Sequence, residues 1–221
     1  MNKGHAHMDV ITIDGPSAAG KGTIGLMLSQ RLGYYYLDSG SLYRQLAAWA
    51  LDAGGDLSDE AVVYTIITDK LSKTDFNSEQ SDRLRSSEVS DAASKIGVLR
   101  SVRERANQYQ RDFVASSEKS VIVDGRDAGT VVFPDANFKL FITATPDVRA
   151  QRRYAQLVEQ GYTPDLKSLE EELVQRDLRD QKREIAPLKA APDAYIIDTT
   201  EETSDESVQR ILKYLEKYLA T

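Results

Sequence analysis

With 221 residues, 41% of them hydrophobic, the chain is long enough to bury a sizeable core in one domain, with room for small inserted lobes. Its 28 basic and 35 acidic residues give a formal net charge of −7, which argues against a protein whose main partner is a nucleic-acid backbone. The chain has no cysteine, which excludes disulfides and thiolate metal sites, and it lacks the apolar run of about 18 residues that a membrane-spanning helix needs.

Apolar runs and helical patterns alternate along the chain, in an order typical of a parallel α/β sheet. Strands are expected at residues 10–13, 34–37, 121–124, 138–143 and 194–197. Helices are expected at residues 23–32, 39–53, 58–71, 88–96, 98–115, 147–161, 165–185 and 204–219. We therefore predict a three-layer α/β/α fold around a five-stranded parallel sheet, with right-handed crossovers.

The loops after the strands are expected to hold the ligands, because ligands of such sheets bind beyond the carboxyl ends of the strands. Four loops are then predicted to line one crevice, at residues 14–22, 38–40, 124–127 and 144–147. The polar segment 72–87 has no sustained period and is expected to form an excursion on the surface.

The first of these loops, IDGPSAAGKGT, has the pattern of a phosphate-binding loop between a strand and a helix. Gly15, Gly20 and Lys21 fit the usual motif G-x-x-x-x-G-K-[ST], but Gly22 follows the lysine and the hydroxyl comes one residue late, on Thr23. Backbone N–H groups and the positive end of the helix would bind phosphate, and Lys21 would add a mobile charge. A tight turn that binds nothing is the alternative, although a lysine at a helix N-terminus opposes the helix dipole unless an anion is present.

Two further groups of polar residues follow strands. Ser39 is expected to cap the helix after the second strand, and Arg44 lies about one turn further on, so a second anion could be held between them. A plain cap beside a surface arginine is the alternative. Asp124 closes an apolar strand, a position from which a carboxylate reaches Mg²⁺, often through water, and Arg126 would point into the same crevice. A salt bridge within the turn is the alternative there.

Two predicted helices carry arginines on one face, at spacings that bring side chains together. These residues are Arg149, Arg152 and Arg153 on one helix, and Arg176, Arg179, Asp180 and Arg183 on the next. The two faces flank one Gly/Pro turn and are expected to act as a clamp over polyphosphate. The alternative is a solvated face on which Arg176 pairs with Asp180.

The chain resembles the bacterial cytidylate kinases, which are P-loop nucleoside monophosphate kinases, in segments that occur in family order: ITIDGPSAAGKGT, YLDSGSLYR, VDGRDAGTVVFPDA, RRYAQL and QRDLRDQKREIAPLKAAPDAYIIDTT. These segments cover nearly the whole chain from Val10 to Thr200, and these kinases characteristically read GKGT. The resemblance implies a P-loop fold with small monophosphate-binding and lid lobes. It also implies transfer of the γ-phosphoryl group of ATP, bound with Mg²⁺, to CMP or dCMP.

The same resemblance implies roles for individual residues. ATP would be bound by Gly15, Pro16, Ser17, Ala18, Ala19, Gly20, Lys21, Gly22 and Thr23, with Arg149, Arg152 and Arg153 from the lid. CMP would be bound by Ser39, Arg44, Ser94, Arg103, Arg126, Asp127, Arg176, Asp180 and Arg183. The catalytic residues would be Lys21, Arg126, Arg183 and Asp124, with Mg²⁺ held by ATP and reached by Asp124 only through water.

We expect one kinase domain over residues 8–221, with a core at 8–58, 105–148 and 185–221, a monophosphate-binding lobe at about 59–104 and a lid at about 149–184. Residues 1–7 lack the apolar region of a secretory signal and are expected to be a disordered tail or a cloning remnant. A monomer in the cytoplasm is expected, with ATP and CMP or dCMP as partners and without nucleic acid or membrane.

Three other functions fit the sequence less well. A P-loop kinase for UMP or a non-nucleotide metabolite suits the DSGSLYR and DGRD segments less well than a kinase for CMP does. A nucleotide-dependent switch protein would be expected to place a hydroxyl directly after Lys21. An RNA-binding module conflicts with the negative net charge.

Overall fold

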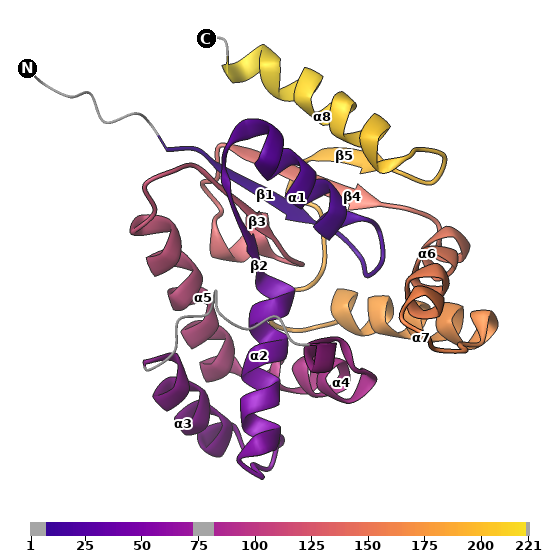
Figure 1. Ribbon diagram of the computed structural model, residues 1–221. Coiled ribbons are helices and arrows are strands. Elements are labelled where there is room, and N and C mark those ends of the chain that lie inside the picture. The colour runs from indigo at the N-terminus through magenta and orange to yellow at the C-terminus, as the bar shows by residue number, and fades with distance from the viewer. Residues whose placement is uncertain (1–7, 73–81, 220–221) are drawn as a thin grey trace, which may run out of the picture. The chain divides into compact units, whose positions relative to one another are not determined.

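A computed structural model describes residues 8–72 and 82–219. The predicted tail at residues 1–7 and most of the predicted surface excursion therefore lie outside the described residues. The strands are β1 (Val10–Asp14), β2 (Tyr35–Asp38), β3 (Val121–Asp124), β4 (Phe138–Thr143) and β5 (Tyr195–Asp198). The α-helices are α1 (Lys21–Leu32), α2 (Ser39–Asp52), α3 (Glu60–Leu71), α4 (Ser87–Ile96), α5 (Arg100–Ala115), α6 (Pro146–Glu159), α7 (Leu166–Gln181) and α8 (Ser204–Leu219) (Figure 1).

The five strands form one parallel sheet in the order β2-β3-β1-β4-β5, which confirms the predicted α/β fold. In the register, Ile11 of β1 lies opposite Ile122 of β3 and Phe138 of β4. The strands are rich in apolar residues because the centre of such a sheet is buried on both faces. Loops that follow β1, β3 and β4 therefore leave the sheet at the same edge.

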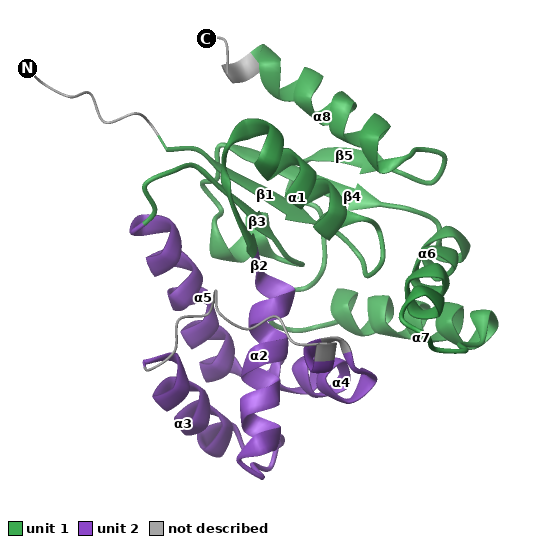
Figure 2. Ribbon diagram, viewed as in Figure 1, with its two compact units in different colours: residues 1–37, 117–221 green, residues 38–116 purple. Residues whose placement is uncertain are grey.

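The chain divides into two compact units (Figure 2). The first unit comprises residues 1–37 and 117–221, and the second comprises residues 38–116. The second unit contains the whole of the predicted monophosphate-binding lobe, 59–104, and extends beyond it on both sides. The predicted lid, 149–184, belongs to the first unit.

In the first unit, α1 and α8 pack against each other over the same face of the sheet (Figure 1). Their apolar residues form one core with the strands, in which Leu28 of α1, Ile211 of α8 and Ile142 of β4 are fully buried. Burial of such aliphatic side chains contributes about 1.5–3 kcal/mol each. This core fixes β1 and α1, and therefore both ends of the loop between them.

In the second unit, helices α2 to α5 surround a core of their own. Leu42 and Leu46 of α2, Ile67 of α3 and Ile96 of α4 are fully buried in it. Helix α2 packs against α4, and α3 packs against α5.

Two local predictions were wrong, and one turn was not predicted at all. Asp38, and not Ser39, caps α2, since its carboxylate accepts the N–H of Ser41 at 2.8 Å. The predicted helix 165–185 ends at Gln181, and residue 186 has a positive φ of 53° before a proline. A π-helical turn at Ala128–Val132 was not predicted, because a residue distant in sequence holds it in place.

Candidate active site

The phosphate-binding loop connects β1 to α1. Gly15 has a φ of 148°, and a Cβ built on it would lie 1.9 Å from the carbonyl oxygen of Ile142, so only glycine can occupy this position. Helix α1 begins at Lys21 with Gly20 as its N-cap, without a side-chain cap and without an acidic residue in the first turn. Its first N–H groups are therefore available to an anion.

Lys21 is 6% exposed, and its ammonium group donates to the carbonyl oxygen of Pro16 at 2.8 Å. The lysine is thus folded back over the loop that it belongs to. This placement holds its charge beside the backbone N–H groups that a triphosphate would contact. Gly22 and Thr23 are exposed at the start of the helix.

Ser17 joins the loop to two arginines of the first unit. Its hydroxyl accepts a hydrogen bond from Nη2 of Arg126 at 2.8 Å. Its carbonyl oxygen accepts one from Nη1 of Arg149 at 3.1 Å. Arg149 also donates through Nε to the carbonyl oxygen of Ala144 at 2.9 Å. These contacts bring together the loops after β1, β3 and β4, as predicted; the fourth predicted loop, 38–40, begins the second unit.

Asp180 of α7 lies between two of the predicted catalytic arginines. Its carboxylate is 1% exposed, accepts from Nε of Arg126 at 3.2 Å and forms an ion pair with Arg183. We call Ser17, Arg126, Asp180 and Arg183 the arginine cluster. One carboxylate between two guanidinium groups leaves an excess of positive charge in this cluster, which suits a phosphate dianion. The cluster directly adjoins the phosphate-binding loop through Ser17.

Asp124 ends β3 beside the first turn of α1. It is 7% exposed, and its Oδ2 accepts a hydrogen bond from the hydroxyl of Tyr36 at 2.9 Å. A Cβ built on Gly22 would lie 3.8 Å from the same oxygen. The carboxylate is therefore positioned next to the lysine end of the loop, where a metal-bound water could meet it.

Asp14, the last residue of β1, is a buried carboxylate that sequence reasoning missed. Its two oxygens accept the N–H groups of Ala128 and Gly129, at 2.8 and 2.7 Å. Burial raises the pKa of Asp14 from 3.8 to about 6, and these two hydrogen bonds oppose the rise. A polar residue that ends an apolar strand directly before Gly15 was the signal that could have identified it.

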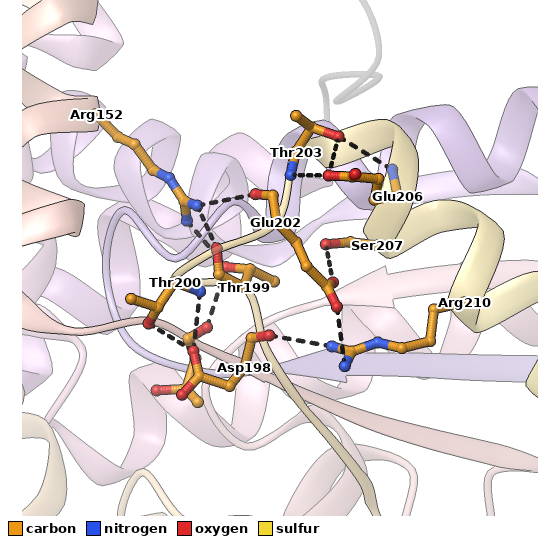
Figure 3. Close-up of polar contacts among 10 residues, drawn as sticks. Arg152, Asp198, Thr199, Thr200, Glu202, Thr203, Glu206, Ser207 and Arg210 are labelled. Carbon is orange, nitrogen blue, oxygen red and sulfur yellow. Dashed lines mark hydrogen bonds and ion pairs between the residues drawn. The ribbon is translucent and has the colours of Figure 1, made fainter.

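The predicted lid arginines each have protein partners. Arg149 is 4% exposed and forms an ion pair with Asp177 of α7, so it ties α6 to α7. Arg152 donates to the hydroxyl and the carbonyl oxygen of Thr199, at 2.9 and 2.6 Å, in the loop between β5 and α8 (Figure 3). Nη1 of Arg153 donates to Gln156, its neighbour on α6, at 2.8 Å.

The β5–α8 loop is also attached to the phosphate-binding loop. The hydroxyl of Thr199 donates to the carbonyl oxygen of Ala19 at 3.3 Å. Figure 3 shows Arg152 next to Thr199 and Glu202. The carboxylate of Glu202 accepts a hydrogen bond from Ser207 and forms an ion pair with Arg210, both in α8. Arg152 and the phosphate-binding loop therefore share one neighbouring segment.

The other predicted acceptor residues of the first unit lie near the arginine cluster in sequence. Asp127 is 7% exposed, and its carbonyl oxygen accepts the N–H of Val131 at 2.9 Å. Arg176, one turn before Asp180 on α7, is half-buried.

The second unit contains the remaining four predicted acceptor residues. Arg44 of α2 forms an ion pair with Asp38 at 3.2 Å, and Ser39 is 8% exposed at the start of the same helix. Arg103 of α5 is 3% exposed; it donates to the carbonyl oxygen of Gly97 at 2.9 Å and lies over a tyrosine ring of α2. Ser94 is half-buried on α4. Helix α2, which carries Arg44, packs against both α4, which carries Ser94, and α5, which carries Arg103.

No helix in residues 8–72 and 82–219 is both long enough and apolar enough to cross a membrane. Likewise, no group of three or more His, Cys, Asp or Glu side chains in this part of the chain is arranged to hold a metal ion.

Comparisons with known proteins identify the family of the chain. The family model described as cytidylate kinase matches residues 11–217. A cytidylate kinase of Chromobacterium violaceum is 42% identical over 96% of this chain and 97% of its own length, and one of Azotobacter vinelandii is 44% identical over 92% and 93%. A solved shikimate kinase of Bacteroides thetaiotaomicron shares the fold, with a TM-score of 0.50 and 16% identity over 95% of this chain and 99% of its own. The chain therefore belongs to the cytidylate kinase family.

Proposed function

We propose that the protein is a cytidylate kinase that transfers the γ-phosphoryl group of ATP to CMP, giving ADP and CDP, and that dCMP is a second acceptor. One observation carries this proposal on the structural side. A phosphate-binding loop with an uncapped helix N-terminus is hydrogen-bonded, through Ser17, to a cluster of arginines in the same unit. The loop supplies a site for the donor phosphates, and the cluster supplies a second anion site directly beside it.

The reaction needs neutralisation of charge more than it needs a base. ATP and CMP both bring phosphates, and the phosphate of CMP is largely dianionic at pH 7 because its second pKa is about 6. Lys21 and the N–H groups of α1 would bind the transferred group, while Arg126 and Arg183 would hold the acceptor phosphate. The acceptor oxygen can then attack in line, without a covalent intermediate.

The residues present would suit Mg²⁺ that is bound mainly by the phosphates of ATP. Asp124 is a buried carboxylate beside Gly22, oriented by Tyr36, and so it would hold a water of the bound ion. Mg²⁺ keeps several waters and is commonly bound by one or two carboxylates together with substrate phosphates. When bound, the ion supplies charge neutralisation at the β- and γ-phosphates.

We carry the remaining predicted roles into this proposal. Arg44 would help to hold the acceptor phosphate, while Ser94, Arg103 and Asp127 would read the cytosine, with Ser39 nearby. Arg176 and Asp180 would meet the ribose. We also propose the domain limits given above, with a lid at 149–184 contacting ATP through Arg149, Arg152 and Arg153. We further propose a monomer that works in the cytoplasm without nucleic acid or membrane.

The competing acceptors are UMP and a non-nucleotide metabolite, and one assay separates them. ADP release is followed with ATP and, side by side, CMP, dCMP, UMP and AMP. We expect the highest kcat/KM with CMP, with dCMP next. Comparable turnover with AMP, or none with CMP, would overturn the assignment, and UMP ahead of CMP would transfer it to the alternative acceptor.

A further inference from the structure

The side chain of Asp14 lies at the junction between the donor loop and the segment that carries Arg126. Asp14 is 3% exposed, ends β1 and directly precedes Gly15. Its Oδ1 accepts the N–H of Ala128 at 2.8 Å, and its Oδ2 accepts the N–H of Gly129 at 2.7 Å. Each carboxylate oxygen therefore holds one of two successive backbone amides.

These two amides open the π-helical turn Ala128–Val132, which directly follows Arg126 and Asp127. Asp127 is the N-cap residue of this turn, but its side chain makes no capping hydrogen bond. A capping residue normally lies directly before the turn that it caps. Here Asp14, at the end of β1, accepts the first N–H groups of the turn in its place. The segment 125–129 is thus attached to the end of β1 through Asp14, and also through the N–H of Gly125, which donates to the carbonyl oxygen of Ile13 at 3.0 Å.

The space around this contact allows little adjustment. A Cβ built on Gly129 would lie 2.6 Å from Oγ1 of Thr12 and 3.3 Å from Oδ2 of Asp14. The absence of a side chain at residue 129 therefore lets the turn approach β1 closely enough for both hydrogen bonds. A shorter or longer acid, or a displaced turn, would break at least one of them.

We propose that Asp14 is a positioning residue for phosphoryl transfer, which keeps the segment carrying Arg126 and Asp127 in a fixed place relative to the donor loop; this inference rests on the proposed function of the same site. Two acceptor oxygens are required because two N–H groups must be satisfied. Asparagine offers one oxygen and one NH₂ group, so it leaves one buried amide facing a donor. Its shape is otherwise that of aspartate, so the substitution removes one acceptor and the charge without changing the packing, and Gly129→Ala, which keeps the charge, separates the two effects.

The test compares Asp14→Asn with Asp205→Asn, a control in which the carboxylate is exposed and lies 3.6 Å from Arg31. KM for CMP, KM for ATP and kcat are measured separately, together with ATP binding by calorimetry. We expect Asp14→Asn to lower kcat/KM for CMP by about ten- to a hundredfold, as for an unsatisfied buried amide, while KM for ATP changes less than about twofold. The control should match the wild type.

A role restricted to folding gives a different result. In that case kcat falls in proportion to the folded fraction measured by circular dichroism, and both KM values stay unchanged, which would overturn the proposal. A larger rise in KM for ATP than for CMP would overturn it too. If Asp14→Asn does not fold, Gly129→Ala decides the question, since it displaces the turn while leaving the carboxylate intact and should show the same selective loss for CMP.

Failure of the proposed function would be seen independently. The wild-type acceptor panel identifies the preferred acceptor before any variant is made. If that acceptor is not CMP, the same comparison is made with the acceptor found, and a selective loss on the acceptor side would still support the role of Asp14.

Discussion

Strands β1 and β2 both end in an aspartate that leads toward a helix, but the two aspartates act differently. Asp38 caps the helix that follows it, α2, and also forms an ion pair with Arg44. Asp14 makes no cap for α1; its carboxylate holds the turn after β3 instead. The N-terminus of α1 therefore has no side-chain cap and is available to phosphate, whereas the N-terminus of α2 is already capped by the carboxylate of Asp38. In the proposed function, the backbone at the start of α1 would therefore bind the donor phosphates, whereas arginines would bind the acceptor phosphate.

The largest effect is expected for Lys21→Ala, which leaves the backbone N–H groups of the donor loop without their mobile charge. Because we propose that Lys21 binds the transferred group, we expect kcat to fall by about a thousandfold or more, with the fold retained. Steady-state ADP release and circular dichroism measure the two quantities. Lys213→Ala, an exposed lysine of α8, is the matched control. Near-wild-type turnover by the Lys21 variant would show that the loop alone neutralises the donor.

Arg126→Ala tests the acceptor side in the same way. It removes one of the two guanidinium groups that Asp180 holds and the partner of the Ser17 hydroxyl. We expect kcat/KM for CMP to fall by about a hundred- to a thousandfold, because a half-buried positive charge and the proposed contact with the acceptor phosphate are both lost. Arg31→Ala, an exposed arginine in the last turn of α1 without a predicted role in the site, serves as the control. An equally large fall in kcat/KM for ATP would contradict the division into donor and acceptor sites.

The buried Asp14 should also make the unfolding free energy of the protein depend on pH. The pKa of Asp14 is raised on folding, from 3.8 to about 6, so its ionisation costs the folded state more than the unfolded state. As the pH rises from about 4 to about 7, the wild type should lose up to about 3 kcal/mol of unfolding free energy relative to Asp14→Asn. Urea denaturation of both proteins at about pH 4, 5.5 and 7 measures this difference. A pH-independent difference would show that Asp14 titrates in the folded protein as it does in the unfolded chain.

The smallest effect is expected at the cap of α2. Asp38→Ala should lower the unfolding free energy by about 1 kcal/mol, since one N–H group of the helix loses its acceptor. It should also raise KM for CMP a few-fold, by releasing Arg44 from its ion pair. Asp59→Ala is the matched control, because Asp59 caps α3 in the same way without contacting an arginine of the predicted site. If both variants raise KM equally, the effect comes from the stability of the second unit and not from Arg44.

Much of the fold follows from local patterns. The predicted strands lie within about one residue of those observed, because each is a short apolar run bounded by polar residues. The phosphate-binding loop was predictable for the same reason, since its glycines and Lys21 are contiguous in sequence. Asp124 and Arg126 could be predicted from their place after a strand.

Contacts between distant residues could not be predicted. The turn Ala128–Val132 is held by a residue 114 positions earlier, and no local signal marks it. The buried ion pair of Arg149 with Asp177 requires the packing of α6 on α7. Likewise, the hydroxyl of Tyr36 reaches Asp124 only because β2 and β3 are neighbours in the sheet. Sequence spacing identified most of the charged residues, but not the partners that orient them.

The carboxylate of Asp180 has a consequence for the entropy of binding. Arg126 and Arg183 are long side chains, and holding such a side chain in one rotamer costs about 0.5–1.5 kcal/mol. In this protein the cost is met during folding, since Asp180 already restrains both guanidinium groups. A phosphate bound by these arginines, as we propose, would therefore meet donors that are already fixed in direction, and its binding would lose less side-chain entropy than binding to a mobile site.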